Sequence, residues 1–153
     1  WGNKIVGGSW RTLTNDEWQY LISRTGKCSL AQITISGKTY NGLVLLPDNW
    51  GGQSLTISNN NYTANKFTEE TWTEMQQNGA VFLPAAGGRS YDKSVQNLST
   101  TGNYWSSDNY DGGTNAYYFY FSSDYGTNTN QYNLTYCGYS VRLVQDVESG
   151  TNP

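Results

Sequence analysis

The sequence predicts a small α+β domain made of two helices, a modest mixed or antiparallel sheet and long irregular loops. Two segments carry a helix N-cap followed by apolar residues at helical spacing, and two continuous apolar runs each end at a proline. Polar stretches rich in Asn, Ser, Thr and Gly separate these elements. The 153 residues fit a single domain. We expect it to span residues 1–147, followed by a tail over 148–153.

The first helix is predicted to begin at Thr14. Thr14 and Glu17 have the spacing of a capping box, in which each side chain accepts a backbone N–H of the other residue. From Trp18 onward, apolar residues recur at i, i+3 and i+4 and form one apolar face. The helix should end near Arg24.

The second helix is predicted to begin at Thr68. The acidic pair 69–70 follows at the positive end of the helix dipole, where carboxylates are stabilised. Trp72 and Met75 give its apolar stripe, and Gly79 suits a left-handed stop.

Short strands are predicted for most of the remaining chain. Residues 31–35 alternate in polarity and turn at Gly37. The apolar runs 43–46 and 80–83 do not alternate, which indicates strands buried on both faces. Further strand candidates are 104–106, 116–121 and 140–144, and long polar loops are expected over 59–66 and 87–100.

The composition excludes several classes of function. With 6 Trp, 13 Tyr and a net charge of −3, the chain is unlike a disordered protein. It has no cluster of Lys and Arg, so we expect no nucleic-acid partner. No apolar run approaches the roughly 18 residues of a membrane span, and no signal-like stretch is present. Any targeting segment would therefore lie outside this sequence.

The residues available for chemistry are few. The chain has no His, which removes the commonest general base and the commonest transition-metal ligand. We therefore expect no enzymatic activity, no cofactor and no metal. Residues 108–113 offer oxygen ligands but lack the spaced carboxylates of a calcium loop, and a turn explains them better. A disulfide between Cys28 and Cys137 and two free thiols fit the sequence equally well.

The segment 108–139 has an unusual composition. Of its 32 residues, eight are Tyr, five Asn, four Gly, four Thr, three Asp and two Ser. Antibody loops favour Tyr, Ser, Gly and Asn, because Tyr offers a large contact area at little entropic cost and Asn and Ser form adaptable hydrogen bonds. A solvated β-rich surface, in which Tyr and Thr serve strand propensity, would give the same composition.

Strand alternation over 116–121 favours a contact surface. Phe119 and Phe121 have no polar atom, so they should face the core and take Tyr117 with them. Tyr118 and Tyr120 should then face outward as neighbours, and outward aromatic side chains beside polar loops suggest a binding surface.

Five motifs, in order along nearly the whole chain, resemble a known family. They are Trp-Arg-Thr-Leu-Thr at 10–14 with Glu-Trp at 17–18, Gly-Leu-Val-Leu-Leu-Pro-Asp at 42–48, Gly-Ala-Val-Phe-Leu-Pro-Ala-Ala-Gly at 79–87, Gly-Asn-Tyr-Trp-Ser-Ser at 102–107 and Gly-Tyr-Ser-Val-Arg-Leu-Val at 138–144. The sequence thereby resembles the Fibrobacter succinogenes major paralogous domain, common in surface proteins of gut bacteria. It equally resembles the variable proteins of diversity-generating retroelements in bacteria and phages. The resemblance implies a C-type-lectin-like fold. Members of the family usually carry a further N-terminal portion upstream of the position of Trp1, so either that portion has been removed here or this version closes its sheet differently.

The resemblance also implies that residues after the Tyr-Trp-Ser-Ser motif are displayed for ligand binding. In family members with retroelements, randomised Asn-type codons never yield Trp, Lys, Glu, Gln or Met. Those types make up 22 of the 107 residues before Asp108, whereas 108–139 holds only Gln131. This depletion favours a diversified surface, in which Cys137 is a candidate variable position. The predicted contact residues are Asp108, Tyr110, Tyr118, Tyr120, Ser122, Asp124, Tyr125, Asn128, Asn130, Tyr132, Asn133 and Tyr136.

We therefore predict a monomeric, non-enzymatic, adhesin-like binding domain at the cell surface, outside the cell or on a phage particle. Its partner would be a surface protein or glycan of another cell or of a phage host. One alternative is a structural surface or pilus module, which would self-associate through a large face. Another is a catalyst, because Gly-Gly-Ser-Trp at 7–10 and the motif at 138–142 resemble formylglycine-generating enzymes. In those enzymes the two elements lie close together, and the cysteines have a defined active-site setting that this sequence does not show.

Overall fold

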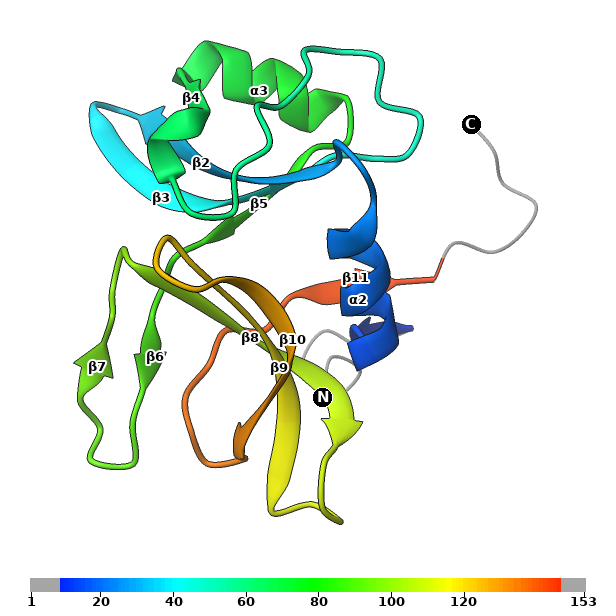
Figure 1. Ribbon diagram of the computed structural model, residues 1–153, viewed down its shortest axis with the longest axis vertical. Helices are drawn as coiled ribbons and strands as arrows, with labels where there is room; N and C mark the ends of the chain where they lie inside the picture. The colour runs from blue at the N-terminus through cyan, green and yellow to red at the C-terminus, as the bar shows by residue number, and fades with distance from the viewer. Residues whose placement is uncertain (1–8, 147–153) are drawn as a thin grey trace.

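The computed structural model describes residues 9–146 and shows a small α+β domain (Figure 1). The expected tail at 148–153 and the glycines of the 7–10 motif lie outside the described residues. The helices are α2 (Asn15–Ser23), α3 (Glu69–Gln77) and the short 3-10 helix η1 (Tyr62–Ala64). The strands are β1 (Trp10–Thr12), β2 (Cys28–Ile35), β3 (Lys38–Leu45), β4 (Lys66–Phe67), β5 (Val81–Pro84), β6 (Gly88–Arg89), β7 (Val95–Gln96), β8 (Thr101–Asn109), β9 (Asn115–Ser122), β10 (Gly126–Leu134) and β11 (Leu143–Gln145).

Both predicted helices form with the predicted caps. Thr14 and Glu17 make a complete capping box at the start of α2, and Arg24 is its C-cap. The Thr68 side chain accepts the Thr71 N–H at the start of α3, and Gly79 has a positive φ of 89° just after the end of that helix. Neither helix is long and apolar enough to cross a membrane.

The first sheet has the order β4-β2-β3-β5 and carries α3 (Figure 1, top). β2 and β3 form a hairpin through the turn at Gly37, as predicted. The apolar run 43–46 is buried because β3 lies between β2 and β5. Trp72 and Met75 of α3 pack on one face of this sheet, together with Ile33 and Val44.

The second sheet is an antiparallel meander of β8, β9 and β10, below the first sheet in Figure 1. Trp18 of α2 is fully buried against one face of it and stacks on Phe119 at 4.9 Å between ring centroids. Phe121 belongs to the same apolar cluster, as does Leu30 of the first sheet. One continuous core therefore joins α2 to both sheets.

Two further strand pairs complete the fold. β1 pairs with β11, which brings the two ends of the described chain together beside α2. The hairpin of β6 and β7 lies beside the second sheet, because Gly87 bridges Gly102 and Arg89 bridges Gly138.

Three features of the fold differ from the sequence prediction. β10 had no predicted strand, because its mostly polar residues gave no apolar alternation. The loop expected over 87–100 contains β6 and β7, and the loop expected over 59–66 contains η1 and the start of β4. The strand predicted at 140–144 is only Leu143–Gln145, since Ser140 forms an isolated bridge to Tyr104.

Candidate functional site

The meander presents a face that points away from α2. Successive side chains of a strand alternate between faces, and residues directly opposite on neighbouring strands share a face. Phe119 and Phe121 point to α2 and are fully buried, as predicted. Tyr118 and Tyr120 therefore lie on the other side. We call this side the outer face. Tyr118 and Tyr120 share it with their cross-strand partners Trp105, Asn103, Gln131 and Asn128.

The prediction that Tyr118 is exposed is wrong, although the face is correct. Only 8% of Tyr118 is accessible. Tyr139 covers it with ring centroids 4.7 Å apart, and Trp105 packs edge-on against it at 5.9 Å. This burial raises the pKa of the Tyr118 hydroxyl. Tyr120, one pair further along β9, remains half-buried and accessible.

The outer face is hollowed on both sides of Tyr118 and Tyr120. The first hollow has a volume of about 220 Å³ and lies between the meander and the β6–β7 hairpin. The second has a volume of about 430 Å³ and lies over β10. Both tyrosines line both hollows, so together these form one grooved surface. The first hollow is completed by Arg89, Gln96, Asn97, Asn103, Asn133 and Tyr139, and the second by Tyr125, Asn128 and Gln131.

The wall of the first hollow is fixed by hydrogen bonds to its backbone. Gly87 N–H donates to Thr101 O over 2.8 Å, and Asn103 Nδ2 donates to Gly87 O over 3.0 Å. Arg89 and Gly138 exchange two backbone hydrogen bonds of 2.8 Å. The hairpin is thus held to β8 at one end and to the segment before β11 at the other.

The β6–β7 hairpin and the segment that follows it contain unusual backbone geometry. Lys93, Asn97 and Ser99 have positive φ values of 65°, 56° and 65°. Such conformations are costly for residues other than Gly, Asn and Asp, and they concentrate at functional sites in proteins. Asn97, which tolerates a positive φ better than the other two, is the one of the three that lines the first hollow.

Several predicted contact residues do gather on the grooved surface. They are Tyr118, Tyr120, Tyr125, Asn128 and Asn133. Tyr125 is the most exposed of them, with 82% of its surface accessible in the turn between β9 and β10. Asn133 is partly committed to the framework, since its Nδ2 donates to the Tyr139 hydroxyl over 2.6 Å.

A second group lies on the opposite face of the meander. Tyr110 and Tyr132 stack with ring centroids 3.7 Å apart, and Tyr117 meets Tyr110 edge-on at 5.4 Å. Tyr117 was predicted to be buried with the phenylalanines, but it is only half-buried because it lies beyond the end of the core. Asn130 is also on this face, where its Oδ1 accepts from Gln19 of α2 over 3.4 Å.

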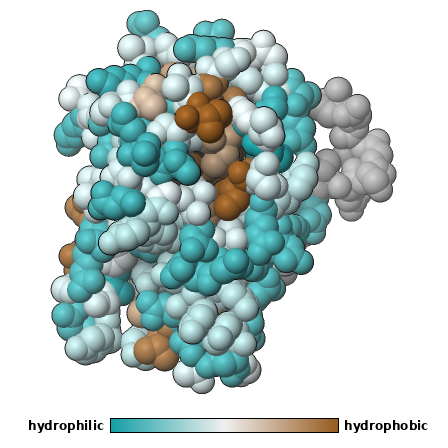
Figure 2. All heavy atoms as spheres, in the orientation of Figure 1, coloured by the Kyte–Doolittle hydropathy of each residue, from teal (hydrophilic) through white to brown (hydrophobic). Residues whose placement is uncertain are grey.

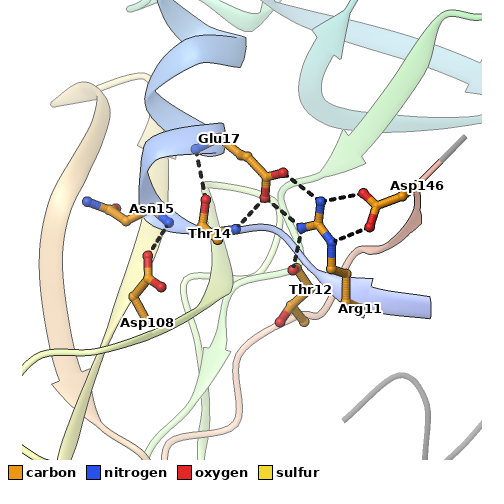
Figure 3. Close-up of polar contacts among 7 residues, drawn as sticks. All are labelled: Arg11, Thr12, Thr14, Asn15, Glu17, Asp108 and Asp146. Carbon is orange, nitrogen blue, oxygen red and sulfur yellow. Dashed lines mark hydrogen bonds and ion pairs between the residues drawn. The ribbon is translucent and has the colours of Figure 1, made fainter. Parts of the chain in front are cut away.

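Two predicted contact residues are structural instead. Asp108 Oδ2 accepts the backbone N–H of Asn15 over 2.6 Å at the positive end of α2 (Figure 3). Ser122 is only 2% exposed, and its Oγ accepts the N–H groups of Asp124 and Tyr125 in the β9–β10 turn. Ser122 is therefore too buried to act as a contact, and one carboxylate oxygen of Asp108 is already engaged. Asp124 in that turn and Tyr136 after β10 are exposed but line neither hollow.

Sequence reasoning missed the residues that surround the predicted contact positions. Trp105 and Tyr139 carry family-like motifs, but alternation within one strand does not show that they cover Tyr118. Arg89, Gln96 and Asn97 were placed in an unstructured loop. The adjacent glycines at 87–88 were the available sequence signal that another segment packs closely against this loop. A Cβ on Gly88 would lie 2.8 Å from the Tyr139 ring, so glycine permits this close approach.

The outer face offers hydrogen bonding and aromatic contact rather than acid–base chemistry. Burial raises the pKa of Cys137, and Tyr139 has a raised pKa for the same reason. Cys28 lies in the first sheet, and burial raises its pKa to about 12. Both thiols are free in the structure. Among residues 9–146, no three His, Cys, Asp or Glu side chains come close enough to hold a metal ion together.

Comparison with known proteins places the chain in a family without assigning it an activity. No curated protein and no solved structure matched the chain. One protein family matched residues 51–144, a range that includes α3, the meander and both hollows. Because this match covers more than half of the chain, the protein belongs to the family described as a domain of unknown function, DUF8237.

Proposed function

We propose that this protein is a non-enzymatic binding domain that acts at a cell surface, outside the cell or on a phage particle. Its ligand would be a protein or glycan on another cell or on a phage host. The observation that carries the proposal is the grooved outer face, where two adjoining hollows share Tyr118 and Tyr120. Ligand sites are concave and combine aromatic surface with a few well-placed polar groups.

The framework beneath the groove supports this proposal. Phe119 and Phe121 are fully buried directly under the outer face, and they pack on Trp18 and Tyr104. Because this support holds β9 rigid, a surface side chain such as Tyr120 can contact a ligand without the entropic cost of ordering the strand on binding.

We propose that the α+β domain has a C-type-lectin-like fold. The pairing of β1 with β11 joins the two ends of the described part of the chain, and two helices flank two small sheets. This arrangement supports the fold that the sequence motifs imply. The long segment between β5 and β8 and the meander after it would then form the binding side.

Diversification of the outer face is also part of the proposal. The side chains at 120, 125 and 128 are accessible and do not belong to the core cluster of Phe119 and Phe121, so their replacement would leave the packing of that core intact. Sequencing of the encoding locus tests this. A nearby reverse transcriptase gene with a near-identical template repeat of the 108–139 coding region is the expected finding, and a locus lacking both would contradict diversification.

The binding function is tested by screening the protein on an array of bacterial surface glycans and purified surface proteins. Binding should be lost in Tyr120→Ala and Tyr125→Ala, because both rings line the groove. Tyr40→Ala is the matched control, since Tyr40 is 45% exposed on β3 in the first sheet. Array binding that survives both groove variants, or that Tyr40→Ala removes equally, would contradict the proposal.

A further inference from the structure

The first hollow contains a cation that the framework leaves largely unpaired. Arg89 is the one formally charged residue lining either hollow. Its Nη1 donates to Lys93 O over 2.8 Å, and among residues 9–146 the guanidinium forms no ion pair. The chain as a whole has a net charge of −3. An unpaired arginine in an otherwise neutral hollow favours a ligand with a negative charge.

The position of Arg89 is set before any ligand arrives. Its backbone pairs with Val95 across the hairpin and with Gly138 on the other side. A Cβ on Gly138 would lie 2.9 Å from the Arg89 Cβ, so the glycine allows the two strands to approach. These contacts fix the backbone that carries the cation, and the exposed side chain is held by the hydrogen bond from Nη1 to Lys93 O.

The groups around Arg89 are neutral and polar. Gln96 and Asn97 supply amide groups, which both donate and accept hydrogen bonds, whereas Asn103 Nδ2 already donates to Gly87 O and Thr101 Oγ1. Tyr120 and Tyr139 add ring faces and hydroxyl groups, and Tyr118 between them is only 8% exposed. Amides suit the alcohol groups of a sugar, and ring faces suit the C–H surface of a sugar ring. An apolar peptide side chain would find little matching surface in this hollow.

We propose that the first hollow binds a saccharide residue that carries a carboxylate, with the Arg89 guanidinium pairing the carboxylate. This inference rests on the proposed function and names its ligand class. The sugar chain continues past Tyr118 and Tyr120 into the second hollow, where Tyr125, Asn128 and Gln131 contact the next residue. The ligand is therefore an acidic oligosaccharide.

The test is a titration of the full chain with three kinds of probe, followed by calorimetry and ligand-observed NMR. The probes are methyl glycosides of uronic and nonulosonic acids, neutral methyl glycosides, and a blocked peptide containing one glutamate. At least one acidic glycoside should bind, and the neutral glycosides should bind at least about 10-fold more weakly, because a charged hydrogen-bonded pair is lost.

Two substitutions and a control locate the binding. Arg89→Gln should weaken binding of the acidic glycoside about 10-fold or more. Arg89→Lys should weaken it less, since the positive charge remains but the planar guanidinium with its paired donors is lost. Arg142→Gln is the control, because Arg142 is exposed and lines neither hollow of the outer face. Arg89→Lys also serves as the test if Arg89→Gln does not fold.

Three results would overturn the inference: no acidic glycoside binds, neutral glycosides bind equally well, or binding is indifferent to both Arg89 variants. Peptide binding that depends on Arg89, without any binding of acidic glycosides, would overturn it in favour of an acidic peptide ligand. Each of these results leaves the proposed function standing if Tyr120→Ala still removes array binding. A separate result contradicts the proposed function itself, namely array binding that is unchanged by Tyr120→Ala and Tyr125→Ala.

Discussion

At the scale of single residues, the two faces of β9 differ in what they tolerate. Phe119 is fully buried between α2 and the meander, Tyr118 is nearly buried beneath Tyr139, and Tyr120 is accessible. Large-to-small changes cost free energy in proportion to the contacts and the space that are lost. Three neighbouring aromatic residues should therefore respond differently to truncation.

Truncation of these residues gives the first prediction. Phe119→Ala should lower the free energy of unfolding by about 3–5 kcal/mol. Tyr118→Ala should also destabilise, by a smaller amount because only its ring packing is lost, and Tyr120→Ala should have the smallest effect. Urea unfolding of the three variants measures this order. Equal losses for Tyr120→Ala and Phe119→Ala would mean that the two faces of β9 are reversed.

Gly102 gives a second prediction at this scale. A Cβ there would lie 2.1 Å from the Phe121 ring, which is fully buried and has no room to move. Gly102→Ala should cost about 1–3 kcal/mol or more through overpacking. Gly51→Ala is the control, because its added methyl meets nothing within 4 Å. Thermal unfolding of the two variants compares them, and similar melting temperatures would contradict this packing.

At the scale of elements, the N-terminus of α2 connects distant parts of the chain (Figure 3). Glu17 accepts from the Thr14 N–H and from both terminal nitrogens of Arg11, each over 2.7–2.8 Å. Arg11 also pairs with Asp146, and Asp108 of β8 accepts the Asn15 N–H. The helix start therefore ties β1, β8 and the end of β11 together.

This junction predicts an acid-sensitive contribution to stability. The hydrogen bonds from Arg11 lower the pKa of Glu17 from 4.5 to about 2. Because the folded-state pKa lies below the ordinary value, ionised Glu17 stabilises the fold fully above about pH 4.5. That contribution is lost as the pH falls toward 2. The effect should be small, since the pair is partly exposed and solvent screens it.

Urea unfolding at several pH values between 6 and 2 measures this contribution. Wild type should lose stability over this range, and Glu17→Gln should be less stable at pH 6 but lose less on acidification. Asp16→Asn is the control, because Asp16 lies in the same helical turn but is exposed and does not contact Arg11. Parallel pH profiles for wild type and Glu17→Gln would exclude a role for this ion pair.

At the scale of the whole molecule, we predict that the protein does not self-associate. Hydrophilic side chains cover most of the view in Figure 2, and the apolar areas are small. Stable protein interfaces bury about 1,200–2,000 Å² in total. We therefore expect the chain to be a monomer, as a display domain requires. Sedimentation at micromolar concentrations checks this, and a stable oligomer would favour the structural surface module instead.

Local patterns in the sequence determined the helices, the buried run of β3, the presence of β5, and the direction of Phe119 and Phe121. These features depend on residues a few positions apart, so spacing alone predicts them. Val81 and Phe82 of β5 are only half-buried, so the prediction of a run buried on both faces is wrong for β5. Tertiary structure decided what covers each face. Tyr139 over Tyr118, Arg89 beside Gly138 and Asp108 at α2 are contacts between residues far apart in sequence. A strand's periodicity shows which side chains share a face, but only the packing of distant segments determines which of them remain open to a ligand.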